Sequence, residues 1–80
     1  MHKYLVIVEK AENNYSAYAP DVPGCITTGR TIEETLSNMR EALQLHLEVT
    51  VEDGDPLPEA YSVHAELVDV DLPATATARS

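Results

Sequence analysis

The sequence predicts a small α+β domain with the element order β-β-β-α-β, in which three antiparallel strands precede one long helix and a fourth strand follows it. A β-branched run near the N-terminus is typical of a strand, and apolar residues at helical spacing occupy the middle of the chain. At 80 residues, the chain has room for one domain. We place this domain at residues 1–72 and expect residues 73–80 to form a disordered tail.

The first three strands are expected at residues 3–10, 15–19 and 25–28. The first is rich in aliphatic residues and is followed by the turn-prone Glu-Asn-Asn at residues 12–14, a connection short enough for an antiparallel hairpin. Side chains alternate between the faces of a strand. The first strand is therefore apolar on both faces, with Tyr4, Val6 and Val8 on one and Leu5 and Ile7 on the other.

The segment at residues 20–24, Pro-Asp-Val-Pro-Gly, predicts a chain reversal between the second and third strands. Pro23 fixes its own φ near −65°, and Gly24 can adopt the positive φ that the third position of a type II turn requires. Cys25, the only cysteine, follows this turn.

The helix is expected from about Ile32 to about Glu52. Thr31 is placed to cap its start and Glu34 to complete a capping box, while Gly54 is suited to end it. One apolar stripe follows the helical period: Ile32, Leu36, Met39, Leu43 and Leu47.

The fourth strand is expected at residues 62–72, where the apolar alternation changes phase between Leu67 and Val68. A right-handed crossover through the helix would place this strand beside the first, giving the spatial order 3-2-1-4.

Charge and cysteine content restrict the classes of partner. Fourteen acidic residues against five Lys and Arg give a formal net charge of −9, which repels nucleic acids and anionic membranes and favours a basic partner. The alternative is that an acidic surface only keeps a small domain soluble. The single cysteine and the absence of an apolar leader predict a cytoplasmic protein that does not associate with membranes.

One helix can cover only one face of a sheet, so the second apolar face of the first strand requires another molecule. We expect a homodimer or homotetramer. The residues assigned to this oligomer interface are Tyr4, Val6, Val8, Val68 and Val70.

The segment from Pro20 to Leu43 resembles the signature of the HicB-like antitoxin family, and the similarity extends from residue 4 to about residue 72. That family combines a "Y.v.v" strand, an aromatic-bearing strand ending in "P.lpGc", and "t.G.T.eEal.n..eAl" at the start of the helix. The matching residues here are Tyr4, Val6, Val8, Tyr15, Tyr18, Pro20, Asp21, Pro23, Gly24, Cys25, Gly29, Thr31, Glu34, Leu36, Asn38, Glu41, Ala42 and Leu43.

The resemblance implies a partial ribonuclease H-like fold that forms dimers or tetramers, binds a small basic mRNA-cleaving toxin of the HicA type and blocks its active site. It implies no catalysis and no cofactor. Family members that repress their own operon carry a DNA-binding segment after the last strand, where this chain has "PATATARS". We therefore expect no direct binding of nucleic acid by this chain alone.

Tyrosines and acids at strand and loop ends are the candidate partner-binding residues, because tyrosine is a frequent interface anchor and acids attract a basic partner. They are Tyr15, Tyr18, Glu9, Glu12, Asp21 and Glu33. Each exposed acid has the simpler interpretation of a solvated surface group.

Catalytic and metal sites are weaker candidates. Cys25 could be a nucleophile, but no histidine has a sequence-based reason to lie beside it, so a structural role is preferred. His2, His46 and His64 are isolated in the sequence. A two-metal nuclease site could draw on Glu9, Glu41, Glu48, Asp69 and Asp71, but the middle of the first strand supplies no carboxylate.

Two functions therefore compete with the antitoxin. The first is an orphan module of the same fold that associates only with itself. The second is a Mg²⁺-dependent nuclease of the ribonuclease H type, which we rank third.

Overall fold

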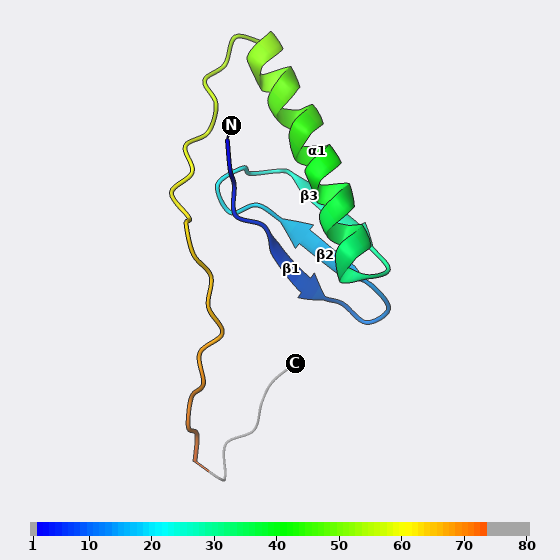
Figure 1. Cartoon of the computed structure of the whole chain (residues 1–80), viewed down its shortest axis with the longest axis vertical. Helices are drawn as coiled ribbons and strands as arrows, with labels where there is room; N and C mark the ends of the chain where they lie inside the picture. The colour runs from blue at the N-terminus through cyan, green and yellow to red at the C-terminus, as the bar shows by residue number, and fades with distance from the viewer. Residues whose placement is uncertain (1, 74–80) are drawn as a thin grey trace.

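Residues 2–73 are described by a computed structural model of the chain. A three-stranded antiparallel sheet lies against one long helix, and an extended segment follows the helix (Figure 1). The strands are β1 (Ile7–Lys10), β2 (Tyr15–Tyr18) and β3 (Ile26–Gly29), and the helix is α1 (Ile32–Glu52). The α+β class and the order of the first four elements confirm the prediction from sequence.

The sheet has the order β1-β2-β3, with β2 in the centre. Val8 pairs with Ala17, and Ala17 pairs with Thr27, so each strand aligns with its neighbour over four residues. The predicted first strand was longer than β1, because β2 ends at Tyr18 and leaves residues 3–6 without a partner on that side.

The turn between β2 and β3 has the predicted geometry. The Cys25 N–H donates to the Val22 carbonyl at 3.3 Å, and Gly24 has φ +84°. Proline at the second position and a positive-φ glycine at the third define a type II turn.

Both ends of α1 are held by local hydrogen bonds. The Thr31 hydroxyl accepts the Glu34 N–H at 3.0 Å. At the other end Gly54, with φ +75°, donates to the Val51 carbonyl, and the Asp55 N–H donates to the Thr50 carbonyl. This pair of bonds is a Schellman motif, which ends the helix where the sequence predicted.

The core lies between α1 and one face of the sheet. Ala17, Ala19, Val22, Cys25 and Met39 are buried there. The predicted helical stripe is wrong at its start, because Ile32 and Leu36 remain 46% and 41% exposed while Thr35 is fully buried. The Thr35 hydroxyl donates to the Thr31 carbonyl at 2.6 Å, so a polar side chain is accommodated inside the turn.

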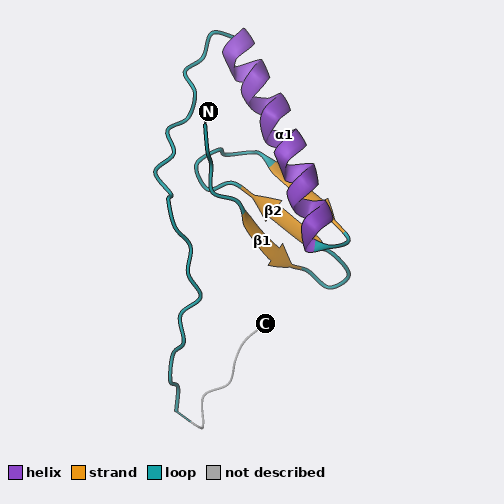
Figure 2. Cartoon of the chain, in the orientation of Figure 1, coloured by secondary structure: helices purple, strands orange, loops and turns teal. Residues whose placement is uncertain are grey.

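The predicted fourth strand does not form within the described residues. Residues 55–73 carry no helix or strand and run past the open edge of β1 as an extended segment (Figures 1 and 2). Without a neighbouring backbone to pair with, this segment has no ladder of hydrogen bonds. The spatial order 3-2-1 is correct, and no strand of residues 2–73 occupies the fourth position beside β1. The expected tail at residues 73–80 lies, apart from Pro73, outside the described residues.

Candidate functional surface

An apolar row crosses the face of the sheet that α1 leaves uncovered. Ile7 pairs with Tyr18, and Tyr18 pairs with Ile26, so the three side chains lie side by side across the three strands. Their neighbours Val8, Ala17 and Thr27 point to the opposite, helix-covered face, because side chains alternate along each strand. Tyr18 is 36% and Ile26 69% exposed. We call these three residues the apolar row.

Three residues expected at the oligomer interface lie on the other face. Tyr4, Val6 and Val8 are half-buried and pack against the core beneath α1. The uncovered face of the first strand instead carries Leu5 and Ile7. The prediction that the sheet has one bare apolar face is consistent with this arrangement, but Tyr4, Val6 and Val8 do not lie on that face.

Tyr4 and Val6 also line a groove between α1 and the stretch of chain that leads into β1, which we call the β1 groove. Its volume is about 500 Å³. Leu36, Leu43 and Leu47 of α1 form its other wall, and the basic side chains of Lys3 and Arg40 lie among its lining residues. The groove is therefore apolar inside and carries positive charge.

The acidic candidates do not form one cluster. Glu12, in the β1–β2 turn, and Glu33, in the first turn of α1, are exposed at the same end of the fold, and Glu9 is exposed at the adjacent end of β1. Asp21 lies in the loop at the opposite end (Figure 1). Its carboxylate accepts hydrogen bonds from the Ser62 N–H and hydroxyl, so it already has an intramolecular partner. Tyr15 is half-buried.

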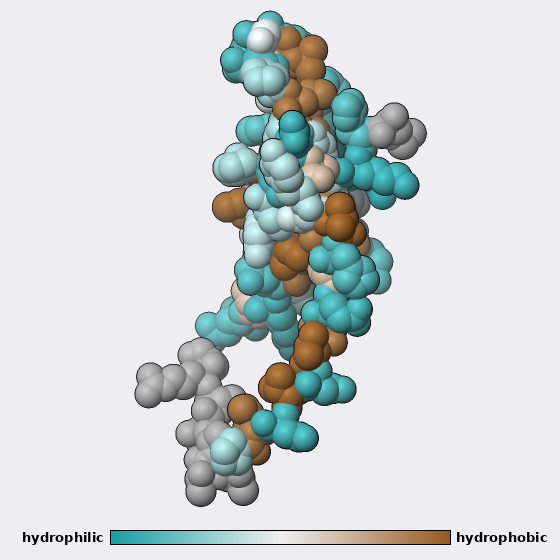
Figure 3. All heavy atoms as spheres, turned by 90° about the vertical axis from the view of Figure 1, so that its left-hand side faces the viewer, coloured by the Kyte–Doolittle hydropathy of each residue, from teal (hydrophilic) through white to brown (hydrophobic). Residues whose placement is uncertain are grey.

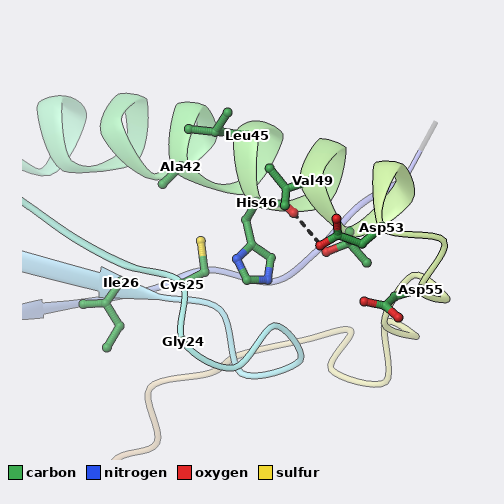
Figure 4. A pocket seen from close by; sticks show the side chains of 10 residues that line it. Gly24, Cys25, Ile26, Ala42, Leu45, His46, Val49, Asp53 and Asp55 are labelled. Carbon is green, nitrogen blue, oxygen red and sulfur yellow. Dashed lines mark hydrogen bonds between the residues drawn. The ribbon is translucent and has the colours of Figure 1, made fainter.

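His46 lies beside Cys25, which the sequence did not predict. Both line a groove of about 590 Å³ between the second half of α1 and the loop before β3, and Figure 4 shows both side chains directed into the space between helix and loop. Burial raises the pKa of the Cys25 thiol. A raised pKa favours the neutral thiol over the nucleophilic thiolate, which supports the structural interpretation of this cysteine.

The same groove contains residues that sequence reasoning missed. Leu45 and Val49 are 65% and 46% exposed and line it together with Ile26. Leu45 and Val49 are four positions apart and fall outside the predicted stripe. A second, shorter apolar row on the helix was therefore the signal that could have found them.

Carboxylate and histidine candidates are distributed over separate elements. Glu41 and Glu48 are exposed on α1, while Asp69 and Asp71 are exposed in the extended segment. Among the charged groups of residues 2–73, His64 contacts Glu66 alone, at 2.9 Å, and His2 lies near the start of the chain. Within residues 2–73, no three His, Cys, Asp or Glu side chains are grouped so that they could hold a metal ion. No helix in this part of the chain is long and apolar enough to cross a membrane.

The chain is thus a small domain with a helix-backed sheet, one bare apolar face and an acidic surface. A model of the HicB-like antitoxins of bacterial toxin–antitoxin systems matches residues 4–76. The chain belongs to this HicB-like antitoxin family. Membership of an antitoxin family indicates a role in binding rather than catalysis.

Curated relatives come from phage, bacteria and archaea. The chain is 33% identical over 81 residues to a 14.9 kDa protein of Haemophilus phage HP1, an alignment that covers 86% of this chain and 61% of the phage protein. It is 44% identical to a UPF0150 protein of Helicobacter pylori, over 51% of this chain and 57% of that protein. A UPF0150 protein of Thermoplasma acidophilum is 37% identical, over 79% of this chain and 99% of its own length. The chain thus spans about three fifths of the first two relatives.

A solved structure has the same fold. One chain of the HicA3 and HicB3 toxin-antitoxin complex superimposes with a TM-score of 0.65 and 30% sequence identity, over 75% of this chain and 70% of that one. The fold of this chain therefore occurs in a complex of a toxin with its antitoxin.

Proposed function

We propose that this chain neutralises a small basic mRNA-cleaving toxin of the HicA type by covering the toxin's active site. The apolar row of Ile7, Tyr18 and Ile26 is the observation that carries the proposal. It lies on the bare face of the sheet, and the opposite face is already packed against α1. Aromatic and aliphatic side chains grouped in this way are typical anchors of a protein interface. Family membership and the solved toxin–antitoxin complex support the same conclusion.

Charge favours a basic occupant for this face. The chain carries a formal net charge of −9. Glu9 shares the uncovered face with the apolar row, since it follows Ile7 by two positions in β1, and the exposed Glu12 lies in the adjoining turn. An RNA-cleaving protein needs a positive surface for its substrate's phosphates. Acids beside an apolar row would attract such a surface and accelerate the encounter.

In this proposal Tyr18, Glu9 and Glu12 contact the toxin, with Tyr18 as the central anchor. Glu33 lies at the same end of the fold and takes part at the rim. Asp21 acts indirectly, because its carboxylate holds Ser62. The protein acts in the cytoplasm, where its single cysteine stays reduced, and it associates with itself as a dimer or tetramer.

Co-expression with the small basic reading frame beside its gene tests the proposal. We expect the two products to purify together and the chain to relieve the growth inhibition that the neighbour causes. Ile26→Asp, which places a charge in the apolar row at an exposed position, should abolish both effects. Val51→Asp is the matched control, because Val51 is also exposed, at 59%, but lies on α1.

Failure of the wild-type chain to bind its neighbour or to rescue growth would remove the antitoxin role. A chain that still associates with itself would then be the orphan module. Cleavage of an RNA–DNA hybrid that requires Mg²⁺ and is lost in Asp69→Asn/Asp71→Asn would instead favour the nuclease.

A further inference from the structure

The extended segment Ser62–Leu72 has the pattern of a strand, but after Ser62, which Asp21 holds, every residue of it is exposed. Val63, Leu67, Val68, Val70 and Leu72 are between 69% and 99% exposed. In Figure 3 hydrophobic and hydrophilic side chains alternate along it. His64 Nε2 and Glu66 Oε1, two positions apart, are 2.9 Å from each other, as expected on one side of an extended chain. The segment therefore has an apolar side without a partner among residues 2–73.

We propose that residues 62–72 of one copy bind in the β1 groove of a second copy as its fourth strand, and that the exchange is reciprocal. The inference rests on the self-association included in the proposed function. It assigns the dimer contact to the open edge of β1 and leaves the apolar row free for the toxin.

The β1 groove matches the segment in apolar character and in charge. Tyr4 and Val6, just before β1, and Leu43 of α1 supply half-buried apolar walls, and no strand of residues 2–73 lies on the outer side of β1. Val68, Val70 and Leu72 fall on one side of an extended chain and would face these walls. Asp69 and Asp71 fall on the other side, within reach of the rim, where the groove carries Lys3 and Arg40. Two of the five Lys and Arg residues of the chain thus line this one groove.

Two sets of hydrogen bonds, from Tyr4 to Pro58 and from Ser62 to Asp21, fix the start of the segment and keep Val68 and Val70 from reaching the groove of their own chain. The Tyr4 hydroxyl donates to the Pro58 carbonyl at 2.6 Å, so residue 58 is level with residue 4. From there the segment runs in the same direction as β1 (Figure 1). Extended chains rise about equally per residue, so Val68 lies beyond Lys10, where β1 ends. Pro56 and Pro58 stiffen the connection.

A second copy removes this conflict. The segment of each chain can keep its anchors at Pro58 and Ser62 and still enter the groove of the partner. The same contact then occurs twice about a two-fold axis, which closes the assembly as a dimer. Because both copies are identical, each one supplies the segment and the groove that the exchange requires.

Two measurements on the full chain, without toxin, test the exchange. Light scattering should give twice the chain mass. A sample mixed from isotope-labelled and unlabelled chains should give nuclear Overhauser contacts between chains from the methyl groups of Val68 and Val70 to Val6 and Leu43. Val68→Asp/Val70→Asp should weaken the dimer by about 100-fold or more, because it buries charge in an apolar groove. Val51→Asp should leave the mass unchanged, and circular dichroism should show α1 intact in both variants.

The outcomes separate the exchange from the proposed function. A dimer whose Val68 and Val70 contacts arise only within one chain, or a dimer that persists in Val68→Asp/Val70→Asp, overturns the exchange and leaves self-association intact. A wild-type chain with the mass of a monomer at high concentration overturns both. Toxin binding is measured separately by co-purification, so its failure would not be confused with either result.

Discussion

The carboxylate of Asp21 joins the loop before β3 to the extended segment by accepting two hydrogen bonds from Ser62, 41 positions away in the sequence. The Ser62 N–H donates at 2.7 Å and the Ser62 hydroxyl at 3.1 Å. A family-signature residue that could have met a toxin is thereby committed to holding the start of the exposed segment. Removal of the Asp21 carboxylate should therefore affect the position of the extended segment before it affects any contact with a toxin.

Asp21→Ala should release Ser62. A hydrogen bond to a charged acceptor contributes about 1.5 kcal/mol at the lower end of its range, and 1.4 kcal/mol corresponds to about tenfold in an equilibrium constant. We therefore expect amide hydrogen exchange at Ser62 to accelerate about tenfold. Asp55→Ala is the control, because Asp55 is exposed and its side chain makes no hydrogen bond within residues 2–73. Unchanged exchange at Ser62 in Asp21→Ala would contradict the anchor.

Gly29→Ala should destabilise the contact between β3 and α1. A Cβ at position 29 would lie 2.5 Å from Thr35 Oγ1, 2.7 Å from its backbone N and 2.9 Å from its Cα. Such overpacking costs about 1–3 kcal/mol, which a lower urea midpoint would report. Thr35→Ala should not rescue the variant, since the two backbone contacts remain. Thr28→Ala, at the exposed neighbouring position, should change the midpoint little, and an equal loss in both variants would refute the steric explanation.

Met39→Ala should create a cavity at the centre of the core. Met39 is 1% exposed, and truncation of a buried methionine costs about 2–5 kcal/mol. Leu45→Ala removes a comparable side chain from the same helix at a position that is 65% exposed. It should cost about 0.5 kcal/mol or less. Equal losses of unfolding free energy in the two variants would show that the helix is rotated from the orientation described.

Ionisation of Cys25 should make the protein less stable at alkaline pH. Burial raises the pKa of this thiol in the folded state, so above the ordinary cysteine pKa of about 8.5 the unfolded chain loses its proton while the folded chain keeps it. The unfolded state then binds fewer protons, and stability falls as pH rises. Wild-type protein should lose more stability than Cys25→Ala between neutral and alkaline pH. Parallel pH profiles would show that the thiol is as accessible when folded as when unfolded.

Local elements were the most predictable part of the fold. Thr31 and Gly54 define the ends of α1 through hydrogen bonds to backbone groups a few residues away. Gly24 likewise permits its turn because no other residue type adopts a positive φ so readily. These outcomes depend on neighbouring residues alone, so the sequence was sufficient to predict them.

Contacts between distant segments were less predictable. The approach of His46 to Cys25 depends on how α1 is rotated against the sheet, and the burial of Thr35 in place of Ile32 and Leu36 depends on the same rotation. The apolar stripe allowed either rotation. The observed rotation of α1 is favoured because Thr35 packs closely against Gly29, where a larger side chain would not fit.

By itself, the sequence determined the order of the first four elements, the boundaries of the helix, the turn at Pro23 and Gly24, and the presence of more apolar surface than one helix can cover. Each of these follows from local hydrogen bonding or from the period of the side chains. Only the tertiary structure decided which face of β1 meets α1, that Asp21 is bound to Ser62, and that residues 62–72 leave the edge of β1 empty. Those features depend on which of several segments, far apart in the sequence, pack against each other, and no local sequence pattern determines that choice.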